Sequence, residues 1–148
     1  MTPVNPTNPG LCGASPQARE NGTGAVRARI AANEASAVAT MRTLNAAETA
    51  YAQMHKETGY TCALSQLSGD RLITPALASG QANGYAFGLR DCAVGVDGGP
   101  NVKYHLVAHP LMANQTGVRA FCSDESAAVR VDASGSAQAC IENGGPLE

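Results

Sequence analysis

The sequence predicts an α+β fold in which one long N-terminal helix packs across a four-stranded antiparallel meander sheet. Residues 24–56 contain no proline and no interior glycine, and they are rich in strong helix formers. From residue 84 onward the apolar residues alternate with other residues, which is the pattern of half-buried strands. Turn-forming segments separate these alternating runs, so neighbouring strands should be antiparallel.

The predicted helix covers residues 24–57. Lys56 in its last turn suits the negative end of the helix dipole, and Gly59 follows where a left-handed cap is expected. The NGTG segment at 21–24 should separate the helix from anything helical before it. At 1.5 Å per residue the helix would be about 50 Å long, against a body about 30–35 Å across, so one end should protrude. One apolar stripe follows the helix: Ile30, Ala37, Met41, Leu44, Ala47, Tyr51 and Met54.

The composition predicts one globular domain over residues 24–148, preceded by a disordered or added tail at residues 1–23. A chain of 148 residues with 44% hydrophobic content can bury one core. The tail is rich in proline, asparagine and glycine, so it cannot pack much apolar surface. No apolar run in the sequence approaches the roughly 18 residues that a membrane span needs.

After the helix, residues 59–84 are predicted to form a long wrapped loop with a short turn or two. Four strands should follow, on alternating runs that begin near Tyr85, Val102, Val118 and Val129. Residues 134–148 are rich in glycine and should be irregular. The helix and sheet are expected to share a core made of Leu44, Tyr51, Phe87, Tyr104, Leu106, Val118 and Val129.

Five widely spaced cysteines indicate disulfide bonds rather than a zinc site, because no CxxC pair and no cluster of cysteine with histidine occurs. Four sites allow three pairings. We favour Cys62 with Cys92, which closes the long loop onto the first strand, and Cys122 with Cys140, which fastens the irregular tail; Cys12 is left over. Disulfides predict an oxidising location: the extracellular space or cell surface, with the periplasm as the alternative.

The sequence favours neither an enzyme nor a nucleic-acid-binding protein. Ten basic and twelve acidic residues give a formal net charge of −2, and the basic residues are scattered. His105 and His109 are four apart in a predicted strand, where about 13 Å separates them, so they cannot share one metal ion. No nucleophile motif such as GxSxG is present. We therefore predict no catalytic residue, no metal ligand and no cofactor.

Several segments together resemble the type IV pilin and type II secretion pseudopilin families. They are RARIAANEASAVATMRTLNAAETAYAQ at 27–53, GYTCALSQL at 59–67, LASGQANGYAF at 77–87, the Tyr104 strand that ends in Ala108-His109-Pro110, and TGVRAFCSDESAAVR at 116–130. The resemblance implies a structural subunit of an extracellular or periplasmic filament, either a type IV pilus-like fibre or a pseudopilus.

The N-terminal segment departs from this family, because residues 1–24 hold none of the roughly 20 apolar residues that open a pilin helix. The partners implied are therefore other pilin subunits or a separate hydrophobic pilin helix chain. Val26, Ile30 and Val38 are predicted to form the assembly interface on the protruding turns. The alternative function is a secreted binding or adhesion module that uses the 59–84 loop and the C-terminal tail.

Overall fold

The computed structural model describes residues 17–95 and 97–147, with side chains from residue 24 onward. Residues 1–16 of the predicted tail lie outside this part, whereas residues 17–23 belong to the long helix. The elements along the chain are α1 (Gln17–Met54), α2 (Leu64–Gly69), α3 (Pro75–Ala78), β2 (Gln81–Ala82), β3 (Tyr85–Val94), β4 (Asn101–Pro110), β5 (Ala120–Asp124), β6 (Arg130–Asp132), α4 (Ala137–Asn143) and β7 (Gly145–Pro146).

Helix α1 begins at Gln17 and passes through the NGTG segment, so the break expected at residues 21–24 does not occur. A glycine inside a helix costs only about 1 kcal/mol relative to alanine, and extending a helix that already exists requires no new nucleus. The helix ends at Met54, slightly before the expected residue 57. Gly59 has the positive φ expected after the helix, and its N–H donates to the His55 carbonyl at 2.8 Å.

The sheet confirms the α+β class and the antiparallel meander, but it contains six strands rather than four, in the order β2-β3-β4-β5-β6-β7. The four predicted strands correspond to β3, β4, β5 and β6. Strands β2 and β7 have two residues each, which is too short for an alternating pattern to show in the sequence. Strand β2 pairs with β3 through a two-residue turn, in which Asn83 and Gly84 both take positive φ as a tight hairpin requires.

Three short helices lie in segments that were predicted as a wrapped loop with a short turn or two and as an irregular tail. The wrapped loop at 59–84 contains α2 and α3, and the C-terminal segment contains α4. Thr74 and Ser136 start α3 and α4 because their side-chain oxygens accept hydrogen bonds from the N–H groups of Leu77 and Ala139. Serine and threonine are also common in ordinary turns. The sequence therefore could not show that these segments form short helices rather than loops.

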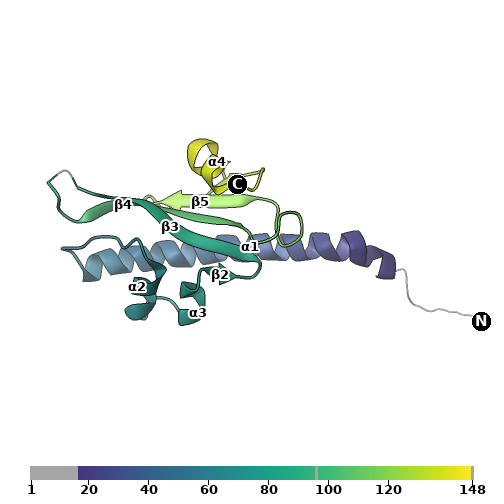
Figure 1. Ribbon diagram of the computed structural model, residues 1–148, viewed down its shortest axis with the longest axis horizontal. Coiled ribbons are helices and arrows are strands. Elements are labelled where there is room, and N and C mark those ends of the chain that lie inside the picture. The colour runs from purple at the N-terminus through teal and green to yellow at the C-terminus, as the bar shows by residue number, and fades with distance from the viewer. Residues whose placement is uncertain (1–16, 96, 148) are drawn as a thin grey trace, which may run out of the picture.

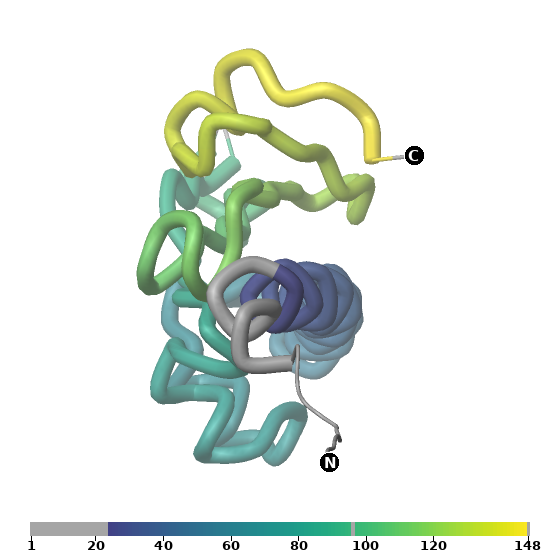
Figure 2. Tube along the Cα trace, turned by 90° about the vertical axis from the view of Figure 1, so that its right-hand side faces the viewer, coloured from purple at the N-terminus to yellow at the C-terminus, as the bar shows by residue number. Residues whose placement is uncertain are grey.

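Helix α1 covers one face of the sheet and extends past it at the N-terminal end, while α4 packs on the opposite face (Figures 1 and 2). The protruding end predicted from helix length is therefore present. Alternation along the strands explains the two faces: Leu106 and Ala108 of β4 point to α1, whereas Val107 packs with Cys122 and Cys140 toward α4.

The core between α1 and the sheet contains most of the residues predicted for it. Leu44, Tyr51, Phe87, Tyr104 and Leu106 are buried in one cluster, and Val129 is half-buried against that cluster. The prediction for Val118 was wrong, because this residue precedes β5 and its side chain is 38% exposed. The remaining members of the buried cluster are Ala37, Met41, Ala47, Leu67, Ile73, Tyr85, Ala108 and Phe121.

Candidate assembly surface

Helix α1 has two parts that differ in burial. From Glu34 to Tyr51 a continuous face is buried against the sheet, whereas every side chain from residue 24 to residue 33 is exposed or only partly buried. Within the exposed part, Val26 and Ile30 are the largest apolar residues and are partly buried. Their four-residue spacing places them one above the other on the same face of the helix.

A group of hydrogen bonds marks the point at which α1 leaves the body of the protein. The N–H groups of Val118 and Arg119 each donate to Oε2 of Glu34 at 3.0 Å, and Arg119 Nε donates to Oε1 at 2.9 Å. One residue earlier, Asn33 Nδ2 donates to the carbonyl oxygen of Thr116 at 2.9 Å. We call these contacts the clamp, because they fasten the middle of α1 to the β4–β5 connection.

The clamp separates the three residues that the sequence predicts as an assembly interface. Val26 and Ile30 lie on the N-terminal side, in the protruding turns. Val38 lies on the other side, one turn after Glu34, and packs against the core cluster of its own chain. Its assignment to an uncovered interface was therefore wrong, because the sheet reaches further along α1 than the helix length alone indicated.

The structure adds apolar residues that the sequence analysis missed. Leu111, Met112 and Val118 in the β4–β5 connection are 43%, 55% and 38% exposed. The clamp holds this connection against α1, and Ile30 lies three residues before Asn33 on the same side of the helix. The assembly patch, as we define it, consists of Val26, Ile30, Leu111, Met112 and Val118. A pair of adjacent apolar residues, Leu111-Met112, at the start of a turn segment was the available sequence clue.

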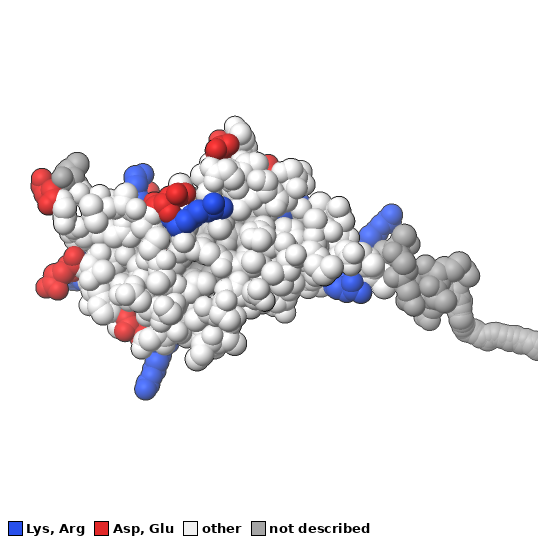
Figure 3. Space-filling model, viewed as in Figure 1, with Lys and Arg blue, Asp and Glu red and all other residues white. Residues whose placement is uncertain are grey.

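Positive charge accompanies this patch. Arg27 and Arg29 are exposed and are the only charged residues from 24 to 33. Blue atoms lie on the described part of the protruding helix (Figure 3). Arg119 forms an ion pair with Glu34 at 2.9 Å and lies over the Phe121 ring at 5.3 Å, so its charge is locally balanced. The protruding end therefore combines apolar side chains with two unbalanced cations among its described residues.

Both predicted disulfide pairings are confirmed. Cys62 bonds to Cys92 with a Cα–Cα distance of 6.1 Å, and Cys122 bonds to Cys140 with a distance of 6.0 Å. The first fastens the segment before α2 to β3, and the second fastens α4 to β5. Cys12 lies outside the described residues. Disulfides are typical of proteins that fold in an oxidising compartment.

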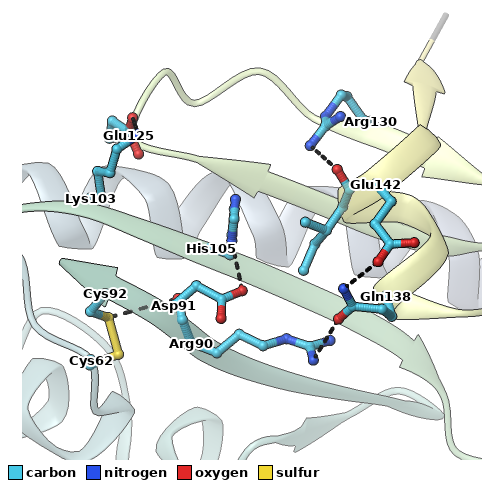
Figure 4. Close-up of polar contacts among 11 residues, drawn as sticks. Cys62, Arg90, Asp91, Cys92, Lys103, His105, Glu125, Arg130, Gln138 and Glu142 are labelled. Carbon is cyan, nitrogen blue, oxygen red and sulfur yellow. Dashed lines mark hydrogen bonds and ion pairs between the residues drawn. A yellow bond between two sulfur atoms is a disulfide. The ribbon is translucent and has the colours of Figure 1, made fainter.

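The sheet face that carries α4 holds polar contacts between side chains, among them a chain from Arg90 through Gln138 to Glu142 (Figure 4). His105 Nδ1 lies 2.9 Å from Asp91 Oδ2, and Lys103 Nζ lies 3.9 Å from Glu125 Oε2. Within the described residues no group of three or more histidine, cysteine, aspartate or glutamate side chains is arranged to hold a metal ion. These pairs join neighbouring strands across the sheet surface.

In comparisons with protein-family models, with curated proteins and with solved structures, no match to the chain was found. The resemblance to pilins therefore stays a prediction. Among the described residues, no helix is both long enough and apolar enough to cross a membrane.

A buried carboxyl group lies in the covered part of α1. Glu48 is fully buried, and its Oε1 accepts a hydrogen bond from the Thr61 N–H at 2.9 Å, while Oε2 has no partner within the described part of the chain. Burial raises the pKa of Glu48 to about 7, although the Thr61 hydrogen bond acts in the opposite direction. Sequence reasoning missed this residue, yet its spacing from Leu44 and Tyr51 places it on the apolar stripe.

Three other polar side chains form a separate buried network. Asn45 Oδ1 accepts hydrogen bonds from the Tyr104 hydroxyl at 2.8 Å and from the Ser123 hydroxyl at 3.1 Å. Burial raises the pKa of Tyr104, and the nearby Glu48 adds to the effect, so the phenol stays protonated. The network thus joins α1, β4 and β5 through polar contacts inside an otherwise apolar core.

Proposed function

We propose that this chain is a structural subunit of an extracellular or periplasmic filament of the type IV pilus-like or pseudopilus kind. The observation that supports this most is the division of α1 into a part packed on the sheet and a protruding part that contributes Val26 and Ile30 to the assembly patch. A partner helix laid along the protruding turns would cover Val26, Ile30 and the β4–β5 connection together. The partner is another subunit or a separate hydrophobic pilin helix chain.

The clamp supports the same proposal in a different way. A subunit can transmit force along a filament only if its helix is fixed relative to its globular part. Glu34 and Asn33 provide four hydrogen bonds to one connection, and three of them go to an ionised carboxylate, which makes them stronger than neutral ones. The patch is therefore presented in one orientation rather than on a loose helix end.

Charged substitutions test the proposal in cells that produce the chain. Ile30→Asp and Met112→Asp should leave the thermal midpoint nearly unchanged and abolish incorporation into filaments. Ala28→Asp is the matched control, because Ala28 is exposed in the same turns but two residues from Ile30, on the opposite side of the helix. Val38→Asp should instead lower the midpoint strongly, because Val38 packs against the core.

The readout is negative-stain microscopy of filaments from the native source, combined with mass spectrometry of their subunits. Absence of this chain from every filament would refute the proposal. Filaments that incorporate Ile30→Asp and Met112→Asp as well as the native chain would refute the assembly patch.

A secreted binding or adhesion module remains the second candidate, and one observation favours it. The 59–84 segment forms an open groove of about 620 Å³ whose apolar wall includes Leu72, Ile73 and Leu77. Thr43→Glu would place charge in this groove without touching the core, because Thr43 is exposed and lines the groove from α1, on the far side of the clamp from Val26 and Ile30. This substitution should abolish surface attachment if the chain is an adhesion module and should leave filament incorporation intact if it is a filament subunit.

A further inference from the structure

The two ends of the molecule carry different surfaces. The protruding turns of α1 form one end, and the β3–β4 hairpin forms the other, together with the C-terminal turn of α1 (Figure 1). Hydrogen bonds fasten this second end into one unit. Asn101 N donates to the Thr58 carbonyl oxygen at 2.9 Å, and Tyr60 N donates to the Asn101 carbonyl oxygen at 3.1 Å. We call this surface the hairpin end; it comprises residues 54–60, 94–95 and 97–102.

Exposed apolar side chains gather at the hairpin end. Val94 of β3 is 60% exposed, and Val102 of β4 is 49% exposed. They lie on neighbouring strands, because Val94 is paired with Asn101, the residue before Val102. Met54, the last residue of α1, is 57% exposed. A group of large exposed apolar side chains, unlike a single one, is typical of a surface that a partner covers.

The hairpin end also carries two carboxylates that no described cation balances. Glu57 and Asp97 are exposed, and neither forms an ion pair with a described residue. Lys103 is paired with Glu125 at 3.9 Å. Lys56 follows the end of α1 by two residues, where a cation offsets the negative end of the helix dipole. Red atoms lie at this extremity of the molecule in Figure 3.

The protruding end of α1 has the complementary arrangement. Each residue of a helix is turned by about 100° from the one before it, so Arg27 and Arg29 lie about 80° to either side of the face that Val26 and Ile30 share. Both arginines are exposed, and neither forms an ion pair with a described residue. An apolar pair flanked by two cations therefore lies at one end of the molecule, and apolar side chains with two free carboxylates lie at the other.

We propose that the hairpin end of one copy of this chain docks onto the protruding end of α1 in a second copy. The exposed valines of the hairpin end would cover Val26 and Ile30, and its two carboxylates would face Arg27 and Arg29. This contact rests on the proposed function, since it takes another subunit as the partner of the assembly patch and specifies which surface of that subunit fits.

Two different surfaces at opposite ends make the contact heterologous. Each added copy leaves one free hairpin end and one free helix end, so the contact can repeat along a filament instead of closing into a two-fold dimer. A purely hydrophobic partner helix would cover Val26 and Ile30 but would leave both flanking arginines without a counter-charge. The carboxylates of the hairpin end supply that counter-charge, and complementary charges select the partner and fix the register of the contact.

Reversal of the charges at each end tests this contact in the purified chain, with self-association measured by sedimentation velocity over a range of protein concentrations. One variant carries Arg27→Glu and Arg29→Glu, and the other carries Glu57→Lys and Asp97→Lys. Each variant alone should self-associate at least about tenfold more weakly than the native chain, because like charges then face each other. An equimolar mixture of the two variants should associate again, because each reversed end meets an oppositely charged end of the other variant.

Arg42→Glu is the matched control, because Arg42 is an exposed arginine of the same helix beyond the clamp; this variant should self-associate as the native chain does. All variants should keep the native thermal midpoint, since the substitutions lie on the surface. Three results would overturn the contact. They are a native chain that stays monomeric up to about 1 mM, a mixture that associates no better than either variant alone, and equal weakening in the Arg42 variant.

Filaments from the native source separate this contact from the proposed function. If filaments contain the native chain and also incorporate both charge-reversed variants, the contact is wrong and the proposed function stands. If purified chains associate with the expected charge pattern but no filament contains the chain, the contact stands and the proposed function is wrong. Val102→Asp, which places charge among the exposed valines, should weaken the association of the purified chain as the charge reversals do.

Discussion

Replacing Glu48 by glutamine should remove much of the pH dependence of folding between about pH 4.5 and pH 7. In the native chain Glu48 is fully buried with a single hydrogen bond, from the Thr61 N–H. Glutamine has nearly the same shape, keeps an oxygen that can accept this bond, and carries no charge. The substitution therefore removes only the ionisation of the group and leaves its packing in place.

The magnitude follows from the pKa of Glu48, which burial raises from its usual value of 4.5 to about 7. Between these values the folded chain holds a proton that the unfolded chain has released, so the free energy of unfolding decreases as pH rises. The stabilising contribution is fully present below pH 4.5 and is lost by the time pH has passed 7. A shift of this size corresponds to about 3 kcal/mol, and the loss levels off at higher pH.

Urea unfolding followed by circular dichroism, at intervals from pH 4 to pH 8.5 with the disulfides intact, measures this effect. The free energy of unfolding of the native chain should decrease between pH 4.5 and pH 7. That of Glu48→Gln should change less with pH, and at pH 8 it should be higher than that of the native chain. Glu57→Gln is the matched control, because Glu57 is exposed just beyond the end of the same helix. If the free energy of unfolding changed with pH equally in Glu48→Gln and in the native chain, the reasoning from burial would be refuted.

Four further variants test the core, the clamp and a disulfide. Leu106→Ala should cost about 2–5 kcal/mol, because Leu106 is fully buried, and Val118→Ala should cost less than about 1 kcal/mol; denaturant unfolding compares them. Glu34→Ala leaves two backbone N–H groups without their acceptor and should cost about 2–4 kcal/mol, with faster amide exchange at Val118 if the clamp is real. Replacing Cys122 and Cys140 by alanine should cost about 3 kcal/mol, since their bond closes a loop with a sequence separation of 18; an unchanged urea midpoint would contradict this.

Elements with a long periodic pattern could be predicted from the sequence. Helix α1 and the four longer strands follow from the spacing of Leu44, Tyr51, Phe87 and Leu106, because each pattern repeats over several residues. The two-residue strands β2 and β7 could not be predicted, because a pattern of period two needs more than two residues to be recognised. The disulfide pairing was a choice among three that the sequence alone could not settle, and the structure contains the favoured one.

The errors at Val118 and Val38 both concern contacts between distant parts of the chain. The Val118 N–H donates to Glu34, 84 residues earlier in the sequence, and Val38 packs against a core cluster that includes residues of the sheet. Local periodicity contains no information about such a contact, so the assembly patch could be located only in part, at Val26 and Ile30.

The clamp also affects how a force applied to the N-terminal end of α1 would be transmitted to the rest of the protein. Both disulfides join segments that follow the helix, so the described part of α1 is held to the body by the backbone at its C-terminal end and by noncovalent contacts. Along the helix from the protruding end, the clamp at Asn33 and Glu34 comes first, and the buried face that runs to Tyr51, with Asn45 and Glu48 within it, follows. Because the clamp bonds run to an ionised and largely buried carboxylate, they resist such a pull before the core is disturbed. A chain weakened at Glu34 would therefore keep its sheet and disulfides while losing the fixed orientation of its protruding helix.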